Sequence, residues 1–214
     1  SGSCIQFFPM PDAYLANQAI ISSSYSGTSY LVFDTRNKVF LAPGDWGMVM
    51  PVYDDLEAVS VLGMLSSKND GEGIIIMKDV ANQMKVAYVN AKNNVLKSVW
   101  PETKGNIVEN SVFLTSQKES ILYYSKGNEI FRYNFESDGN FPGSSDYTVG
   151  EEGDIVKGMM LDPQEKNLYV ALDAAGNQEY KGCVYCYDVA TKSLKWKERG
   201  VAGEIVQMIY KEQK

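Results

Sequence analysis

Short strand-like runs recur along this chain at a nearly constant spacing. Glu129–Asn134 and Cys183–Asp188 each contain a Tyr followed by Asn or Asp at their end, and each follows another β-prone run, Leu122–Tyr124 in the first case and Leu168–Val170 in the second. The two preceding runs begin 46 residues apart. A period of about 43–50 residues with four short strands in each repeat is the signature of β-propeller blades.

The other β-prone runs of the chain fit four such blades. We expect strands, blade by blade, at Tyr30–Asp34, Lys38–Leu41 and Met48–Tyr53; at Ala58–Leu65, Gly73–Lys78, Lys85–Asn90 and Val95–Trp100; at Ile107–Thr115, Ser120–Ser125, Glu129–Phe135 and near Tyr147; and at Ile155–Leu161, Leu168–Asp173, Cys183–Asp188 and Leu194–Glu198. The third strands of the last two blades are 54 residues apart, so the last blade carries about eight extra residues in Ala174–Lys181.

The ends of the chain decide how these blades close. A blade buries one face of its sheet only against the next blade, so the repeats must form a ring. Ile205–Tyr210 has the pattern of a further inner strand, and residues 4–8 and 19–23 are apolar enough to pair with it. We therefore expect an all-β chain, a β-propeller of about five four-stranded blades, or four if Ile205–Tyr210 completes the first, or the carboxyl-terminal portion of a larger propeller. Residues 1–27 would contribute to ring closure and 28–214 would hold the blades.

The composition of the chain excludes several classes of partner and of catalytic chemistry. The 20 Lys and Arg against 27 Asp and Glu give a net charge of −7. An acidic chain lacks the basic surface that nucleic acids and anionic membranes require, so we expect neither as a partner. No apolar run is long enough to span a membrane. The absence of His removes Ser-His-Asp and Cys-His catalysis and His-ligated metals. We expect no enzyme activity, no cofactor and no metal.

Two of the three cysteines have a spacing that resembles a metal or redox motif. Cys183 and Cys186 lie three positions apart in a run that alternates like a strand, so their side chains point to opposite faces. No second Cys pair and no His completes a zinc set. We expect both to be small buried hydrophobic residues.

Ligands of propellers bind over the central channel, where the loops between second and third strands and between successive blades lie. Three aromatic residues fall in those loops of the expected blades: Tyr53, Trp100 and Tyr180. Their flat rings can stack on sugars, and we name them as candidate glycan contacts, with packing at the blade edge as the alternative. Asp54 and Asp55 form an acidic pair in the same class of loop, which we interpret as a solvated loop rather than a catalytic pair.

Two stretches resemble known families. Gly182–Gly200 looks like a quinoprotein-type propeller repeat, with Lys192 where the turn usually has Gly. Ile121–Asn134, together with Gly203–Lys211, resembles the carboxyl-terminal propeller-like part of the PKD-like family lipoproteins of Bacteroides-type bacteria, and Tyr30–Phe40 resembles the early blade of that family. The resemblance extends roughly over residues 28–214. It implies a periplasmic or cell-surface lipoprotein that accompanies glycan or nutrient uptake, although no signal peptide is visible in this chain.

Three functional hypotheses follow. The first is a non-enzymatic binding or scaffold module of a secreted or cell-surface lipoprotein, with glycans or outer-membrane uptake proteins as partners. The second is a propeller enzyme that acts on polysaccharide as a lyase or glycosidase, which the absence of His disfavours. The third is a platform for protein–protein interaction alone. We expect the first.

Overall fold

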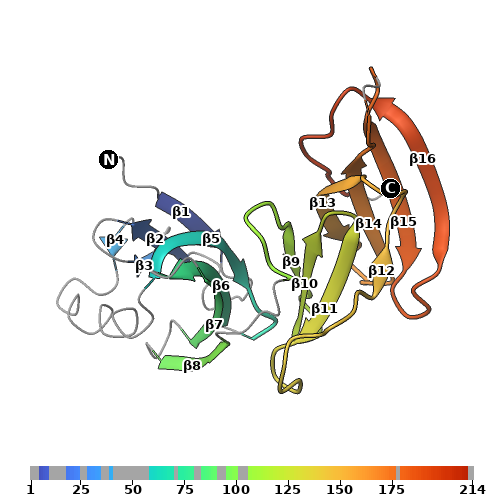
Figure 1. The fold of residues 1–214 in the computed structure, drawn as a ribbon. Coiled ribbons are helices and arrows are strands. Elements are labelled where there is room, and N and C mark those ends of the chain that lie inside the picture. The colour runs from blue at the N-terminus through green and yellow to red at the C-terminus, as the bar shows by residue number, and fades with distance from the viewer. Residues whose placement is uncertain are drawn as a thin grey trace. The chain divides into compact units, whose positions relative to one another are not determined.

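The computed structural model describes residues 5–9, 18–24, 28–34, 39–40, 58–69, 72–79, 83–90, 95–100, 106–176 and 179–211. Within these ranges the chain forms strands and turns, and none of the described residues is helical. The strands make four antiparallel sheets of four strands each, and in each sheet the strands that follow one another in the chain are neighbours. The chain divides into two compact units, residues 1–105 and 106–214, each with two sheets (Figure 1).

The first unit holds the first two sheets. One consists of β1 (Ile5–Pro9), β2 (Gln18–Ser24), β3 (Thr28–Asp34) and β4 (Val39–Phe40), and the other of β5 (Ala58–Ser66), β6 (Glu72–Asp79), β7 (Met84–Asn90) and β8 (Val95–Trp100). Strand β5 lies against β1, β2 and β3, so the second sheet packs by its first strand on the first sheet. The apolar run Ile74–Ile76 of β6 is buried, which explains why this stretch carries no polar alternation.

The second unit repeats this pattern. Its first sheet consists of β9 (Phe113–Thr115), β10 (Ile121–Lys126), β11 (Glu129–Asn134) and β12 (Tyr147–Thr148). Its second sheet consists of β13 (Ile155–Leu161), β14 (Asn167–Asp173), β15 (Gly182–Asp188) and β16 (Leu194–Ala202). Strand β13 lies against β9 and β10, as β5 does against the first sheet.

One continuous core joins the two sheets of the second unit. Tyr123 and Ile130 from the β9–β12 sheet meet Leu168, Val170 and Leu172 from the β13–β16 sheet. The three residues of β14 alternate along the strand, so they lie on the same face of their sheet. Alternation of this kind is what a blade needs, because one face must be buried against its neighbour.

Tyrosines supply much of the apolar surface of this core. The rings of Tyr147 and Tyr187 pack edge to face with centroids 5.4 Å apart. Burial raises the pKa of Tyr187 to about 12, with the nearby Tyr185 adding to the effect. The phenol therefore stays neutral at physiological pH, and the core contains no phenolate charge there.

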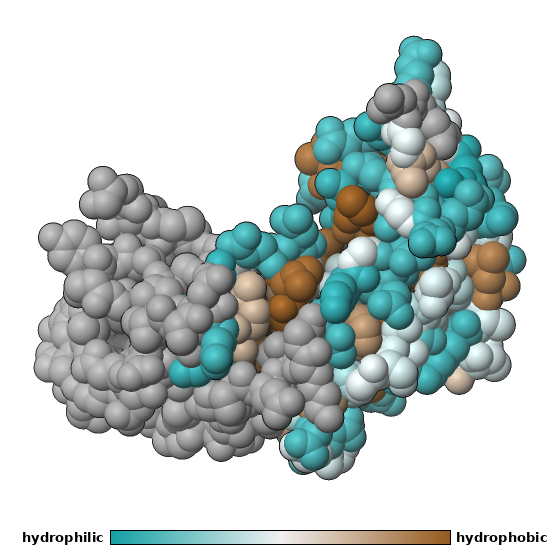
Figure 2. Space-filling model, viewed as in Figure 1, coloured by the Kyte–Doolittle hydropathy of each residue, from teal (hydrophilic) through white to brown (hydrophobic). Residues whose placement is uncertain are grey.

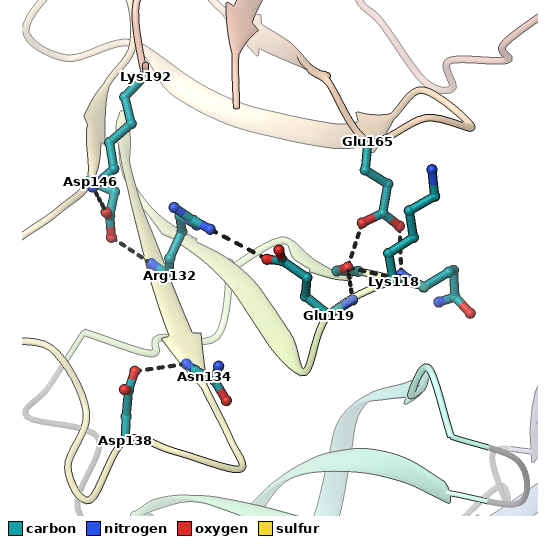
Figure 3. Close-up of polar contacts among 10 residues, drawn as sticks. Lys118, Glu119, Arg132, Asn134, Asp138, Asp146, Glu165 and Lys192 are labelled. Carbon is teal, nitrogen blue, oxygen red and sulfur yellow. Dashed lines mark hydrogen bonds and ion pairs between the residues drawn. The ribbon is translucent and has the colours of Figure 1, made fainter. Parts of the chain in front are cut away.

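Polar contacts at the sheet ends join the same two sheets (Figure 3). Glu165, in the turn between β13 and β14, accepts hydrogen bonds from the Ser116 hydroxyl and from the Gln117 backbone N–H, the latter at 2.6 Å. Lys192, in the turn between β15 and β16, forms an ion pair with Asp146, which in turn accepts a hydrogen bond from the backbone N–H of Arg132. These contacts fix the register in which the two sheets stack.

Most of the expected strands within the described residues are confirmed. The strand expected at Met48–Tyr53 lies outside the described residues. The expectation for Ile205–Tyr210 is wrong, because these residues form no strand in the structure. The described residues of 4–8 and 19–23, which we expected to pair with Ile205–Tyr210, have other partners. Ile5–Pro9 pairs with Gln18–Ser24, which pairs in turn with Thr28–Asp34, so the first sheet is built from its own four strands.

No helix in the described residues is long and apolar enough to cross a membrane.

Removing the Glu165 carboxylate tests the contact between the sheet ends. We expect Glu165→Ala to lower the free energy of unfolding by about 1–2 kcal/mol, because two hydrogen bonds to a carboxylate are lost. Urea denaturation measures the change. Glu119→Ala is the matched control, since its carboxylate is exposed and lies 3.9 Å from Arg132, and it should cost less than about 0.5 kcal/mol. Equal losses in the two variants would contradict this account of the contact.

Candidate ligand-binding site

Three segments meet at one end of the β13–β16 sheet. They are residues 149–154 before β13, residues 174–181 between β14 and β15, and the end of β16 with Gly203. The backbone N–H of Ala175 donates to Asp154 Oδ1 at 2.8 Å, and the backbone N–H of Lys181 donates to the carbonyl of Gly203 at 3.4 Å. The sequence predicts that these loops share one face, and for this sheet the contacts confirm it.

Asp154 organises this end of the sheet from a buried position. Its side chain is 1% exposed. It accepts hydrogen bonds from the backbone N–H groups of Glu151 and Ala175 and from Arg199. Burial by itself would raise the pKa of Asp154, but these three donors and the positive charge of Arg199 hold the pKa below its usual value. The carboxylate is therefore ionised and fully engaged at neutral pH.

Arg199 links Asp154 to the surface. Its Nη1 donates to Asp154 Oδ2 at 2.9 Å and to the hydroxyl of Tyr185 at 2.8 Å. These hydrogen bonds raise the pKa of Arg199 further above its usual value. The same Nη1 lies 3.8 Å from the carboxylate of Glu151, which is largely exposed. A row of three charged side chains thus runs from the buried Asp154 through Arg199 to the solvent-facing Glu151.

Gly150 makes the close approach of Asp154 feasible. Its φ of 76° is in the left-handed region, and a Cβ at this position would lie 2.4 Å from Asp154 Oδ2. Any side chain would therefore meet both backbone strain and a steric clash with the carboxylate. The glycine is required for this loop conformation.

Tyr180 is the exposed aromatic residue of this end. It lies in the segment 174–181 and is 55% exposed. Its backbone carbonyl and Cβ lie 3.7 and 3.8 Å from where a Cβ of Gly200 would be, so the residue is seated against the end of β16. An exposed ring on a segment tied to two neighbouring loops can offer a flat apolar surface to a ligand.

The other two predicted contact residues are not tested. Tyr53 lies outside the described residues, as do Asp54 and Asp55. Trp100 is the last residue of β8, and its side chain is not described. A glycan-contact role for Tyr53, Trp100 and Tyr180 therefore stays a prediction.

The structure adds residues that the sequence analysis did not single out. Asp154 and Arg199 are 45 positions apart, and although Arg199 lies within the repeat-like stretch Gly182–Gly200, nothing in the sequence pairs it with Asp154. A weak signal was present, because Asp154 follows the glycine-rich stretch Gly150–Gly153 directly before a strand. An Asp in that position often caps a tight turn.

Two other predicted features have structural roles. Cys183 and Cys186 are free and buried, as expected. Trp196 lies in β16, where a strand was expected at Leu194–Glu198, and its ring is 6.2 Å from that of Tyr169. Among the described residues, no group of three His, Cys, Asp or Glu side chains is placed to hold a metal ion.

Comparison with known proteins gives the fold. No family model matches this chain, and no curated protein matches it. Among solved structures, Sqt1 of Saccharomyces cerevisiae aligns with a TM-score of 0.59 at 13% identity, covering 96% of this chain and 50% of its own. An auxiliary nutrient binding protein from Bacteroides thetaiotaomicron aligns with a TM-score of 0.53 at 17% identity, covering 96% and 42%.

A chain of the mitotic checkpoint complex also aligns, with a TM-score of 0.50 at 12% identity, covering 85% of this chain and 49% of its own. This chain therefore spans about half the length of the solved structures that it matches. Together with the repeated four-stranded antiparallel sheets, these alignments identify the fold as that of a β-propeller.

Breaking the Arg199–Asp154 ion pair tests how much this pair stabilises the folded protein. Arg199→Met should lower the free energy of unfolding by about 2–3 kcal/mol at pH 7, because a buried carboxylate loses its charged partner. A lowered pKa stabilises the folded state above about pH 4. The loss should therefore shrink as pH falls through the folded pKa of Asp154.

Urea midpoints at neutral and acid pH measure this effect. Lys197→Met is the control, because Lys197 is an exposed residue of the same strand, and it should change stability little at either pH. A loss in Arg199→Met that is independent of pH would contradict the proposed link to Asp154.

Proposed function

We propose that this chain is a non-enzymatic binding or scaffold module that serves nutrient uptake, in a secreted or cell-surface lipoprotein. The observation that carries the proposal is the alignment of almost the whole chain with an auxiliary nutrient binding protein of Bacteroides thetaiotaomicron. The resemblance of Ile121–Asn134 and Gly203–Lys211 to lipoproteins of Bacteroides-type bacteria points in the same direction. A glycan is the ligand class we propose, and outer-membrane uptake proteins are the proposed partners.

The end of the β13–β16 sheet has the chemistry that a sugar needs. A sugar ring offers an apolar C–H face and a rim of hydroxyls. The exposed ring of Tyr180 can pack against the first, and the exposed carboxylate of Glu151 can accept hydrogen bonds from the second. Arg199, held by Asp154 and Tyr185, adds a fixed donor near Glu151.

The same geometry supports binding rather than turnover. Hydrolysis of a glycoside needs two carboxyl groups that flank the scissile bond, one of them able to donate a proton. Asp154 is buried and held ionised by three donors, so it is unsuited to that role. We therefore keep an enzyme that acts on polysaccharide as the weaker alternative.

A protein-interaction platform is the second candidate function. It is favoured by the alignment with a chain of the mitotic checkpoint complex. The two candidates differ in what binds: a platform would retain an uptake protein and would show no affinity for free oligosaccharides.

Replacing Tyr180 tests the proposed function. We expect the purified protein to bind one or more neutral oligosaccharides on a glycan array, and Tyr180→Ala to weaken that binding about fivefold, because stacking on an aromatic ring is worth about 1 kcal/mol. Isothermal titration calorimetry with the best array ligand measures the change. Tyr210→Ala, at a comparably exposed tyrosine away from these loops, should bind as the unmodified chain does.

Three results would contradict the proposal in different ways. Absence of binding to every glycan, together with retention of an uptake protein, would favour the platform. Unchanged affinity in Tyr180→Ala would move the ligand away from this end of the sheet. Release of new reducing ends from a polysaccharide would favour the enzyme.

A further inference from the structure

Two buried polar atoms in the β9–β12 sheet have no hydrogen-bond partner among the described residues. They are the Nε of Arg132, in β11, and the hydroxyl oxygen of Tyr147, in β12. Tyr147 is 3% exposed and belongs to the core that this sheet shares with β13–β16. Buried polar atoms of folded proteins are almost always paired, so these two atoms require an explanation.

The register of the strands places the two residues on one face of their sheet. Ile130 pairs with Tyr147 and belongs to the same core. Arg132 follows Ile130 by two positions on β11, so its side chain is on that face as well. On the neighbouring strand Tyr123 pairs with Arg132, and the Arg132 guanidinium lies 5.5 Å from the centre of the Tyr123 ring. Arg132 and Tyr147 are thus diagonal neighbours on adjacent strands, a separation that long side chains can bridge.

Both atoms can donate a hydrogen bond. Burial raises the pKa of Tyr147 and the nearby Tyr123 adds to the effect, whereas the positive charge of Arg132 opposes it. The phenol therefore keeps its proton at neutral pH. The Nε of a guanidinium can only donate. What these two groups lack is an acceptor.

The charge of Arg132 is also incompletely balanced. On the face drawn in Figure 2 the described residues of the second unit are mainly hydrophilic, whereas the Arg132 side chain is only 23% exposed. Its Nη2 lies 3.9 Å from the carboxylate of Glu119, which is itself 64% exposed, and this distance is too long for a hydrogen bond. Asp146 accepts from the backbone N–H of Arg132 and forms its ion pair with Lys192 (Figure 3). A largely buried guanidinium without a close counter-charge is destabilising.

We propose that Arg132 and Tyr147 bind a small monovalent inorganic anion such as chloride between the β9–β12 and β13–β16 sheets. The anion accepts hydrogen bonds from Arg132 Nε and from the Tyr147 hydroxyl, and it balances the guanidinium charge. A water molecule could accept both hydrogen bonds but would leave that charge unbalanced. A site beside a tyrosine that is 3% exposed suits a single ion better than a larger phosphate or carboxylate ligand.

The proposed ion stabilises the contact between the two sheets. Its two donors come from β11 and β12, and the ring of Tyr147 packs on Tyr187 of the β13–β16 sheet. All of these residues belong to the second unit. The site shares no residue with the loops that hold Tyr180, so it does not depend on the proposed binding of glycans.

Urea denaturation at constant ionic strength tests the proposal, with sodium chloride replaced stepwise by sodium gluconate. Constant ionic strength keeps general screening of charges the same. We expect chloride to raise the urea midpoint until the site is saturated. At a chloride concentration ten times the dissociation constant, the unfolding equilibrium constant should be about tenfold lower than in gluconate alone. Anomalous diffraction from crystals soaked in bromide should place an ion within hydrogen-bond distance of Arg132 Nε and the Tyr147 hydroxyl.

Three variants make the result specific. Tyr147→Phe keeps the ring that packs on Tyr187 and removes one donor, so the affinity for chloride should fall about tenfold. Arg132→Met should remove the response to chloride. Tyr133→Phe is the matched control, because the Tyr133 hydroxyl donates to the carbonyl of Asp138 and the residue is on the other face of β11. It should respond to chloride as the unmodified chain does.

Several results would overturn the proposal. Equal urea midpoints in the two salts would do so, as would an ordered water without bromide at this position. A response to chloride that is the same in Tyr147→Phe, in Arg132→Met and in the unmodified chain would place the effect elsewhere. A bromide peak at the two donors without any effect of chloride on stability would mean an adventitious ion only.

Discussion

Burial of one face of the β13–β16 sheet against the β9–β12 sheet is the interaction on which the described structure depends. Each large apolar side chain removed from water there, such as Tyr123 or Val170, contributes about 1.5–3 kcal/mol before the cost of ordering the chain. A four-stranded sheet with an apolar face is unstable in water unless another element covers that face. The hydrogen bonds within each sheet set its shape, and this burial sets where one sheet lies relative to its neighbour.

The candidate ligand-binding site lies at one end of one of these two sheets. At one end of the β13–β16 sheet, the segment before β13 and the end of β16 come close enough for Asp154 and Arg199 to pair. That pair, with the glycine at position 150, gives the exposed Tyr180 and Glu151 a fixed support.

The strands were largely predictable because β-branched and aromatic runs separated by turn residues are local signals. Ile155–Leu161, for example, is identical in prediction and structure. Ile205–Tyr210 has an equally strong local pattern and yet forms no strand, since a strand is defined by its pairing partner and not by its own sequence. The Asp154–Arg199 pair was not predictable for a related reason: it joins residues 45 positions apart that meet only when the sheet forms. Tyr180 could be predicted as a loop residue because the repeat places residues 174–181 between the second and third strands of a sheet.

Native-state hydrogen exchange in the Val170→Ala variant tests most directly whether the two sheets of the second unit share one core. Val170 is fully buried in β14, at the centre of that core. If the sheets form one cooperative body, the slowest amides of β10 and of β14 should lose protection by the same factor, corresponding to about 1–3 kcal/mol. Loss of protection in β14 with unchanged protection in β10 would contradict the account, because it would mean that each sheet is stable without its neighbour.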